Sequence, residues 1–185
     1  TMSSGHSKAV ELFQYVAIVV VAVLLAFFIR TFVAEVYEVP TGSMLNTIQL
    51  GDRLVGEKLT YHFGGTPQAG DVITFTSPLN SDTLLVKRVI ATAGQTVDLR
   101  DGAVYIDGQL LDEPYTEGKP TYSLADRNGA VIQDYPYTVP AGHIFVMGDN
   151  RTNSLDSRYF GPVAVSTVTS KAMFIFWPFD HARGL

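Results

Sequence analysis

The chain has 185 residues, 46% of them hydrophobic, and a formal net charge of −5 without any block of basic residues. This length suffices for one membrane anchor and one modest domain, and the acidic balance argues against nucleic acid as a partner. The absence of cysteine excludes disulfides and thiolate metal sites, but it does not indicate a compartment.

The first predicted element is a membrane-spanning helix. Residues 12–29 carry no charge and only one strongly polar residue, Gln14. As a helix, this run would be about 27 Å long, close to the hydrocarbon thickness of a bilayer. A cleavable signal peptide and a buried core helix are the alternatives, but the run is long for a signal peptide and no clear cleavage site follows it. We predict a tail over residues 1–11, a retained anchor over residues 12–34, and the lipid bilayer as a partner.

The charges that flank this run do not indicate its orientation in the membrane. Lys8 precedes the predicted helix and Arg30 follows it, so the positive-inside rule hardly discriminates between the two orientations. Arg30 is placed to reach the aqueous interface with its charged end.

Residues 35–185 are predicted to form one β-rich domain. Short β-branched or apolar runs alternate with Gly and Pro, and no amphipathic helix appears among them. We predict strands over residues 36–39, 71–76, 84–90, 96–100, 103–106, 144–147 and 168–177. Asp101-Gly102 indicates a hairpin turn. The pattern predicts a mainly β fold, a curved antiparallel sheet or barrel, with a polar excursion around residues 115–137.

A serine at a glycine-containing bend is the first candidate for chemistry. Ser43 lies in the run Pro40-Thr41-Gly42-Ser43-Met44, directly after a predicted strand. Such a bend can expose a hydroxyl and turn backbone N–H groups toward one point. Taken alone, this sequence is more often a simple turn.

A lysine in the middle of an apolar strand is the second candidate. Lys87 lies within LLVKRVI, and lysine is seldom fully buried. Burial would lower the pKa of the amine, and a neutral amine can take a proton from a serine. Taken alone, the pattern favours the alternative, a lysine on the solvent face of an edge strand beside Arg88.

A dense polar segment at residues 148–158 is the third candidate. Its sequence, GDNRTNSLDSR, concentrates charged and amide groups. A calcium loop and an ordinary surface turn are alternatives, but the spacing of an EF-hand is not met. Asn150-Arg151-Thr152 also matches a glycosylation acceptor, a pattern common by chance.

These three segments together resemble the bacterial type I signal peptidases, a family of membrane-bound serine–lysine peptidases. The resemblance covers roughly residues 35–178 in the order found in the family. The serine, lysine and glycine–aspartate boxes of the family are similar to PTGSM at 40–44, VKRVIATAGQ at 86–95 and GDVITF at 70–75. The late box, GDNRxNSxDSR, is matched by residues 148–158 at every fixed position, which makes an accidental match improbable.

The resemblance implies roles for single residues. Ser43 matches the nucleophile and Lys87 the general base. Thr41 stands where the family usually has a serine whose hydroxyl completes the oxyanion hole with the backbone N–H of Ser43, and Ser154 matches the residue that orients the lysine amine. Asn46 stands where the family commonly has proline, a departure that could loosen the segment behind the nucleophile.

Other positions are expected to support the site or contact the substrate. Asp156 and Arg158 match a charged pair that braces the site, and Asp149 is a further supporting residue. The shallow substrate subsites are expected to be lined by Tyr37, Val39, Leu85 and Val86.

The implied activity is that of a signal peptidase I, which cleaves exported preproteins after small residues of the Ala-x-Ala type. No metal ion or cofactor is expected. The resemblance further implies a single-pass protein of the plasma membrane with its catalytic domain on the extracytoplasmic side, and a secretion machinery is a further candidate partner.

Several other functions remain open at this point. A self-cleaving, repressor-like Ser–Lys peptidase would need a DNA-binding domain where the anchor lies. A non-enzymatic anchored β-domain is disfavoured by the intact site residues. A Ser-His-Asp hydrolase would draw on His6, His62, His143 or His181, but no G-x-S-x-G elbow is present. Signal peptidases of the eukaryotic type use a histidine base, whereas Lys87 favours the bacterial type.

Overall fold

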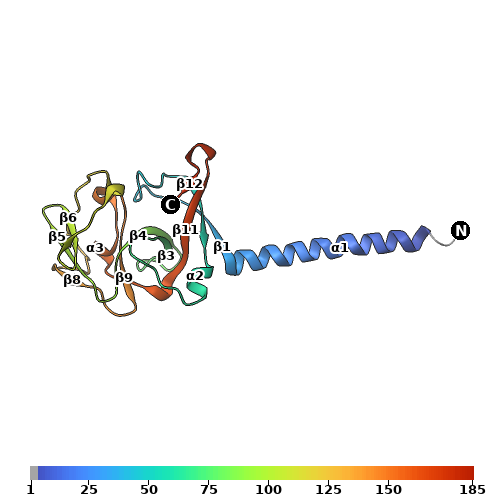
Figure 1. Cartoon of the computed structure of the whole chain (residues 1–185), viewed down its shortest axis with the longest axis horizontal. Coiled ribbons are helices and arrows are strands. Elements are labelled where there is room, and N and C mark those ends of the chain that lie inside the picture. Colours follow the sequence, from blue (N-terminus) through green and yellow to red (C-terminus); the bar gives the residue numbers. More distant parts are fainter. Residues whose placement is uncertain (1–3) are drawn as a thin grey trace.

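A single long helix extends from one side of a β-rich region in the computed structural model, which describes residues 4–185 (Figure 1). Helix α1 runs over Ser4–Phe28 and continues as the π-helical segment η1, Ile29–Val33, which leads directly into strand β1. The helix therefore begins within the predicted tail over residues 1–11, of which residues 1–3 lie outside the described residues.

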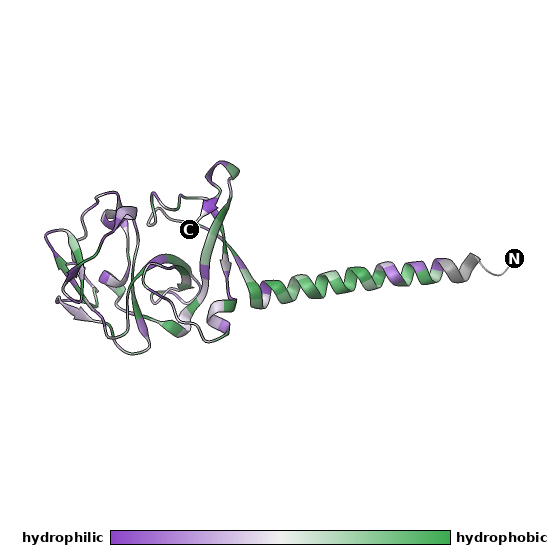
Figure 2. Ribbon diagram, in the orientation of Figure 1, coloured by the Kyte–Doolittle hydropathy of each residue, from purple (hydrophilic) through white to green (hydrophobic). Residues whose placement is uncertain are grey.

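The helix does not serve as a core element of the β-rich region. Residues 8–33 form one helical stretch long and apolar enough to cross a membrane, and none of its apolar window is buried within the protein. Figure 2 shows an almost continuous hydrophobic ribbon along α1 that ends at the β-rich region. The buried core helix considered above is thus excluded.

Within the described residues, the strands that follow η1 form two antiparallel sheets. The larger sheet has the strand order β1-β2-β11-β3-β4-β9-β10, with β12 paired to β11, and the smaller sheet has the order β7-β6-β5-β8. The strands of the larger sheet are β1 Ala34–Glu38, β2 Arg53–Glu57, β3 Val72–Thr76, β4 Leu84–Thr92, β9 His143–Met147, β10 Val163–Ala164, β11 Val168–Trp177 and β12 Arg183–Gly184. The strands of the smaller sheet are β5 Thr96–Arg100, β6 Ala103–Ile106, β7 Gln109–Leu110 and β8 Tyr137–Thr138.

The helices outside α1 and η1 are short. They are α2 Leu59–His62, α3 Ser157–Phe160 and the 3₁₀ turns η2 Pro114–Thr116, η3 Arg151–Asn153, η4 Val165–Thr167 and η5 Phe179–His181. The expectation of a mainly antiparallel β fold with one apolar N-terminal helix is confirmed. The alternative of a closed barrel is not confirmed, because over residues 4–185 the larger sheet ends at β1 and at β10, and these two strands do not pair.

Strand β4 separates two hydrophobic clusters because its side chains alternate between the faces of the sheet. Val86 packs with Val39 in one cluster. Leu85 packs against another, which contains Phe75 and Val89. Lys87 lies between these apolar neighbours and opposite Ile73 of β3, so the strand carries this amine into the interior.

Candidate active site

Ser43 and Lys87 meet although 44 positions separate them in the sequence. Ser43 lies in the loop that follows β1, and Lys87 lies in the middle of β4. The Lys87 Nζ donates a hydrogen bond of 2.5 Å to the Ser43 Oγ. Lys87 is 3% exposed and Ser43 8% exposed, so the alternative of a lysine on the solvent face is wrong.

The environment of Lys87 favours the neutral amine. Burial lowers its pKa to about 8, against opposing effects of the carboxylates of Asp156 and Asp149, while the charge of Arg158 lowers it further. With this pKa, roughly a tenth of the amines are neutral at pH 7, far more than for a free lysine. The contact therefore joins a hydroxyl to a base that can accept its proton near neutral pH.

The hydroxyl of Thr41 lies next to the serine hydroxyl. The Thr41 Oγ1 is 3.4 Å from the Ser43 Oγ, and Thr41 is exposed. A threonine at this position therefore keeps a hydroxyl at the mouth of the site. The distance to Ser43 is compatible with a hydroxyl that turns toward an oxygen bound at the nucleophile.

Asn150 and Gly148 hold the serine loop, a role that the sequence pattern did not indicate for either residue. The Asn150 backbone N–H donates to the Ser43 carbonyl over 2.9 Å, and its side-chain amide donates to the Gly42 carbonyl over 2.9 Å. A Cβ at Gly148 would lie 2.4 Å from the Ser43 carbonyl oxygen and 2.3 Å from the Ser154 Oγ. Only glycine allows this approach, and its position in the late sequence box was the available signal.

Asp149 connects the two segments that carry the serine and the lysine. Its fully buried carboxylate accepts from the Thr47 hydroxyl over 2.6 Å and from the Arg88 guanidinium over 2.9 and 2.7 Å. Thr47 follows Ser43 in the same loop, and Arg88 follows Lys87 on β4. The carboxylate thereby fixes the position of one segment relative to the other.

Ser154 contacts Asp156 instead of Lys87. Its hydroxyl donates to the Asp156 Oδ2 over 2.7 Å, and the hydrogen bonds of residues 4–185 include none between Ser154 and Lys87. Because the Ser154 proton is committed to the carboxylate, the lone pairs of its oxygen remain available to an amine. The Arg158 guanidinium donates to both Asp156 oxygens over 2.8 Å each.

The Asp156–Arg158 pair is almost completely buried, with Asp156 0% and Arg158 1% exposed. Burial raises the pKa of the Asp156 carboxyl, but the hydrogen bonds and the charge of Arg158 hold this pKa below its ordinary value. The Arg158 guanidinium also donates to the carbonyls of Arg151 and Tyr122. The pair thus ties the late segment to the polar excursion.

The residues expected to contact substrate lie around the gap between β1 and β4. Val39 and Val86 are buried in one cluster, against which Tyr37 packs. The Tyr37 hydroxyl donates to the Leu84 carbonyl over 2.8 Å across the gap. The Leu85 side chain packs against the other cluster, so only its main chain is placed for a role at this gap.

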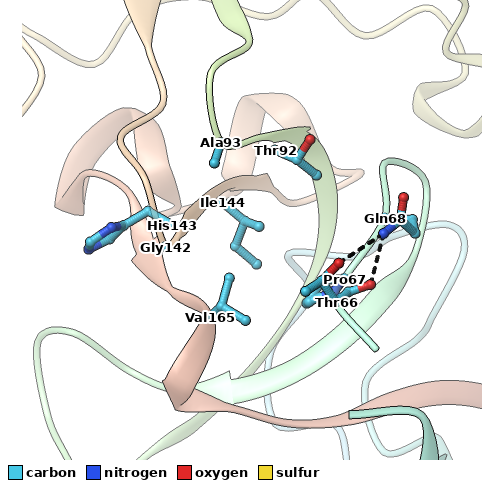
Figure 3. A pocket seen from close by; sticks show the side chains of 9 residues that line it. All are labelled: Thr66, Pro67, Gln68, Thr92, Ala93, Gly142, His143, Ile144 and Val165. Carbon is cyan, nitrogen blue, oxygen red and sulfur yellow. Dashed lines mark hydrogen bonds between the residues drawn. The ribbon is translucent and has the colours of Figure 1, made fainter. Parts of the chain in front are cut away.

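No described histidine contacts Ser43. His62 lies edge-on to Phe32, and His181 hydrogen-bonds Asp52 over 2.9 Å. His143 contacts the Ala141 carbonyl at the rim of a pocket of about 290 Å³ that includes none of the site residues described above (Figure 3). The side chain of His6 lies outside the described residues.

Within residues 4–185, no three His, Asp or Glu side chains lie close enough together to hold a metal ion.

Comparisons with known proteins all point to one family. The family described as "Signal peptidase, peptidase S26" matches residues 12–177. A probable signal peptidase I-1 from Synechocystis sp. is 42% identical, over 89% of this chain and 82% of its own. Signal peptidase I T from Bacillus subtilis is 36% identical, over 99% and 94%. Signal peptidase I from Mycobacterium tuberculosis is 35% identical, over 95% and 80%.

A crystal structure is also similar to this chain. It is that of a signal peptidase I from Enterococcus faecalis V583, with 39% sequence identity and a TM-score of 0.47. The match covers 57% of this chain and 95% of the solved one.

Proposed function

Since the chain belongs to the peptidase S26 family of signal peptidases, serine endopeptidases that remove signal peptides, we propose that it acts with Ser43 as the nucleophile and Lys87 as the general base. The hydrogen bond between the Lys87 Nζ and the Ser43 Oγ supports this assignment above all other observations. The same contact argues against a non-enzymatic domain and against a histidine-based hydrolase.

In the proposed reaction, the neutral Lys87 amine takes the proton of the Ser43 hydroxyl as the Oγ attacks the scissile carbonyl. The developing oxyanion accepts hydrogen bonds from the Ser43 N–H and the Thr41 hydroxyl. Lys87 then returns the proton to the leaving amine, and an acyl ester on Ser43 remains. The Lys87 amine then activates a water molecule, which hydrolyses this ester and releases the signal peptide.

The supporting residues limit the motion of the two reacting groups. Asp149 links their segments, and Asn150 holds the carbonyls of the serine loop. We assign Ser154 to the orientation of the amine through its free lone pairs, with Asp156 and Arg158 behind it. Such preorganisation matters because small displacements of reacting atoms are costly in rate.

The substrate is proposed to enter as an extended strand between β1 and β4. Strand β1 pairs only with β2, and the β4 residues before Arg88 pair only with β3, as far as residues 4–185 are concerned. Directly paired strands lie about 4.8 Å apart, whereas a whole tyrosine side chain spans this gap. An added strand can use main-chain hydrogen bonds on both sides, with Val39, Val86 and Tyr37 around its small side chains.

We further propose that α1 crosses the plasma membrane and that the domain from residue 35 onward lies on the extracytoplasmic side. The apolar length of α1 supports the crossing. The short connection supports a site close to the bilayer, because Ser43 follows the end of η1 by one strand and a short loop. Signal peptides emerge at this surface, where a secretion machinery would deliver them.

Cleavage of a defined preprotein tests this function. Detergent-solubilised protein is expected to release a product whose new N-terminus follows an Ala-x-Ala segment, as read by mass spectrometry. Replacing the alanine directly before the cut with leucine is expected to lower kcat/KM by at least about tenfold, because we expect a subsite bounded by the buried side chains of Val39 and Val86 to exclude the larger side chain. Equal cleavage of both substrates, or the same product with Ser43→Ala protein, would argue against the assignment.

A further inference from the structure

A pocket of about 710 Å³ lies where α1 joins the β-rich region. The end of the helix contributes Ala26, Ile29 and Arg30, and β1 contributes Ala34–Val36. Lys58, which follows β2, completes the lining. None of these residues belongs to the candidate active site, and the pocket therefore needs a separate explanation.

The junction is built by specific contacts. The Lys58 backbone N–H donates to the Val33 carbonyl over 2.9 Å, and its ammonium donates to the Arg30 carbonyl over 3.2 Å. Phe32 of η1 packs edge-on against His62 of α2. These contacts hold the Lys58 amine close to the end of the helix.

The charges of the pocket favour a monovalent anion. Arg30 and Lys58 form no ion pair with any carboxylate of residues 4–185. Glu35 is the only acidic residue of the lining, and its Oε2 accepts from the Thr74 and Thr169 hydroxyls over 3.0 Å each. Two cations and one carboxylate leave one positive charge, which matches one phosphodiester.

The position of the pocket at the end of the apolar helix and the apolar residues of its lining favour a lipid as the source of this phosphodiester. An apolar helix that begins near residue 12 reaches the opposite membrane interface after about 30 Å, close to Arg30. Ile29 and Val36 are 42% and 66% exposed beside the cations, although both are apolar. Acyl chains can cover these residues while the headgroup remains at the level of the charges.

We propose that the junction pocket binds the phosphodiester of a glycerophospholipid from the leaflet that α1 enters last. This inference rests on the proposed membrane crossing of α1. The Arg30 guanidinium offers paired donors to two phosphate oxygens, and the Lys58 ammonium adds a point charge. A lipid held there would fix the angle between the helix and the β-rich region, and with it the height of the active site above the bilayer.

Native mass spectrometry of the full chain in detergent, titrated with phosphatidylglycerol, tests the proposal. We expect one tightly retained lipid, with its affinity lowered at least about tenfold in Arg30→Gln/Lys58→Gln protein. Lys8→Gln is the matched control, because it removes a cation at the opposite end of α1. Equal losses in the control and the double variant would indicate only a general attraction of cations to headgroups and would overturn the site, as would no loss in either.

Two further ligands identify the source of the phosphate. Diacylglycerol, which lacks the phosphate, is expected not to be retained, and its tight retention would contradict a phosphodiester site. Glycerol 3-phosphate is expected not to displace the lipid. If glycerol 3-phosphate displaced the lipid at equal concentration, the pocket would be assigned to a free phosphate ester.

The single variant Arg30→Gln keeps the contact of Lys58 with the carbonyl of residue 30, so it repeats the test without loosening the junction. Preprotein cleavage in detergent should stay at the wild-type level, which separates this result from the proposed catalysis.

Discussion

Ser43→Ala, Lys87→Met and the double variant are expected to lose kcat/KM for a preprotein to the same extent, by at least about 10³-fold. The serine is a poor nucleophile without its base, and the amine has no proton to accept without the serine. Because the two groups act as one unit through the 2.5 Å contact, their losses should not multiply. The measurement is single-turnover cleavage of one preprotein at one pH.

A double variant that loses the product of the two single losses would show that the groups act independently. Retained activity in Lys87→Met protein would remove the base from the mechanism.

The free energy of unfolding provides the control for Lys87→Met. The native pKa of Lys87, about 8, lies below the ordinary lysine value of 10.5, so the folded protein binds fewer protons than the unfolded chain between these values. Wild-type stability should therefore rise with pH across this window, and below it the burial of the charged amine should cost about 3 kcal/mol. Lys87→Met lacks this cost and this dependence on pH, so it should be folded and more stable at pH 7.

The buried Asp156–Arg158 pair carries the largest expected effect on stability. Asp156→Asn leaves the Arg158 guanidinium, 1% exposed, without a counter-charge, which should lower the free energy of unfolding by about 3–5 kcal/mol. The depressed pKa of Asp156 means that its contribution is present at neutral pH and is lost as the pH falls through that native pKa. Urea unfolding at pH 7 measures the difference.

Two comparison variants separate this effect from a general loss of charge. Glu38→Gln breaks the exposed pair with Arg53, in which the side chains are 61% and 50% exposed, and should cost less than about 1 kcal/mol. Asp156→Leu/Arg158→Met removes both buried charges and should recover much of the loss. If Asp156→Asn unfolds at the same urea concentration as Glu38→Gln, the bracing role of the pair is wrong.

The sequence predicted those elements whose local pattern was strong. The hairpin over residues 96–106 forms as expected, because Asp101-Gly102 supplies the positive φ angles of its turn. Strand β2 was missed, since charged residues bound it and it contains Gly56. This glycine is required by tertiary packing, because its Cβ would lie 2.1 Å from the Ser170 Oγ. No local pattern encodes such an approach.

The site could be predicted from the sequence only in part. Lys87 taken alone favoured a solvent-facing interpretation, and only the combination of three sequence boxes pointed to Ser43 as its partner. Contacts such as that of Asn150 with the serine loop arise when distant segments come together. The open edge between β1 and β4 likewise depends on the strand order, which hydrophobic patterns do not determine.

The dependence of kcat/KM on pH tests the central claim most directly, because it reports the ionisation of the free enzyme. A neutral Lys87 amine as the base predicts a tenfold rise per pH unit on the acidic side that levels off near pH 8. A rise that continues to the free-lysine pKa of about 10.4, or a flat profile between about pH 6 and pH 10, would contradict the account.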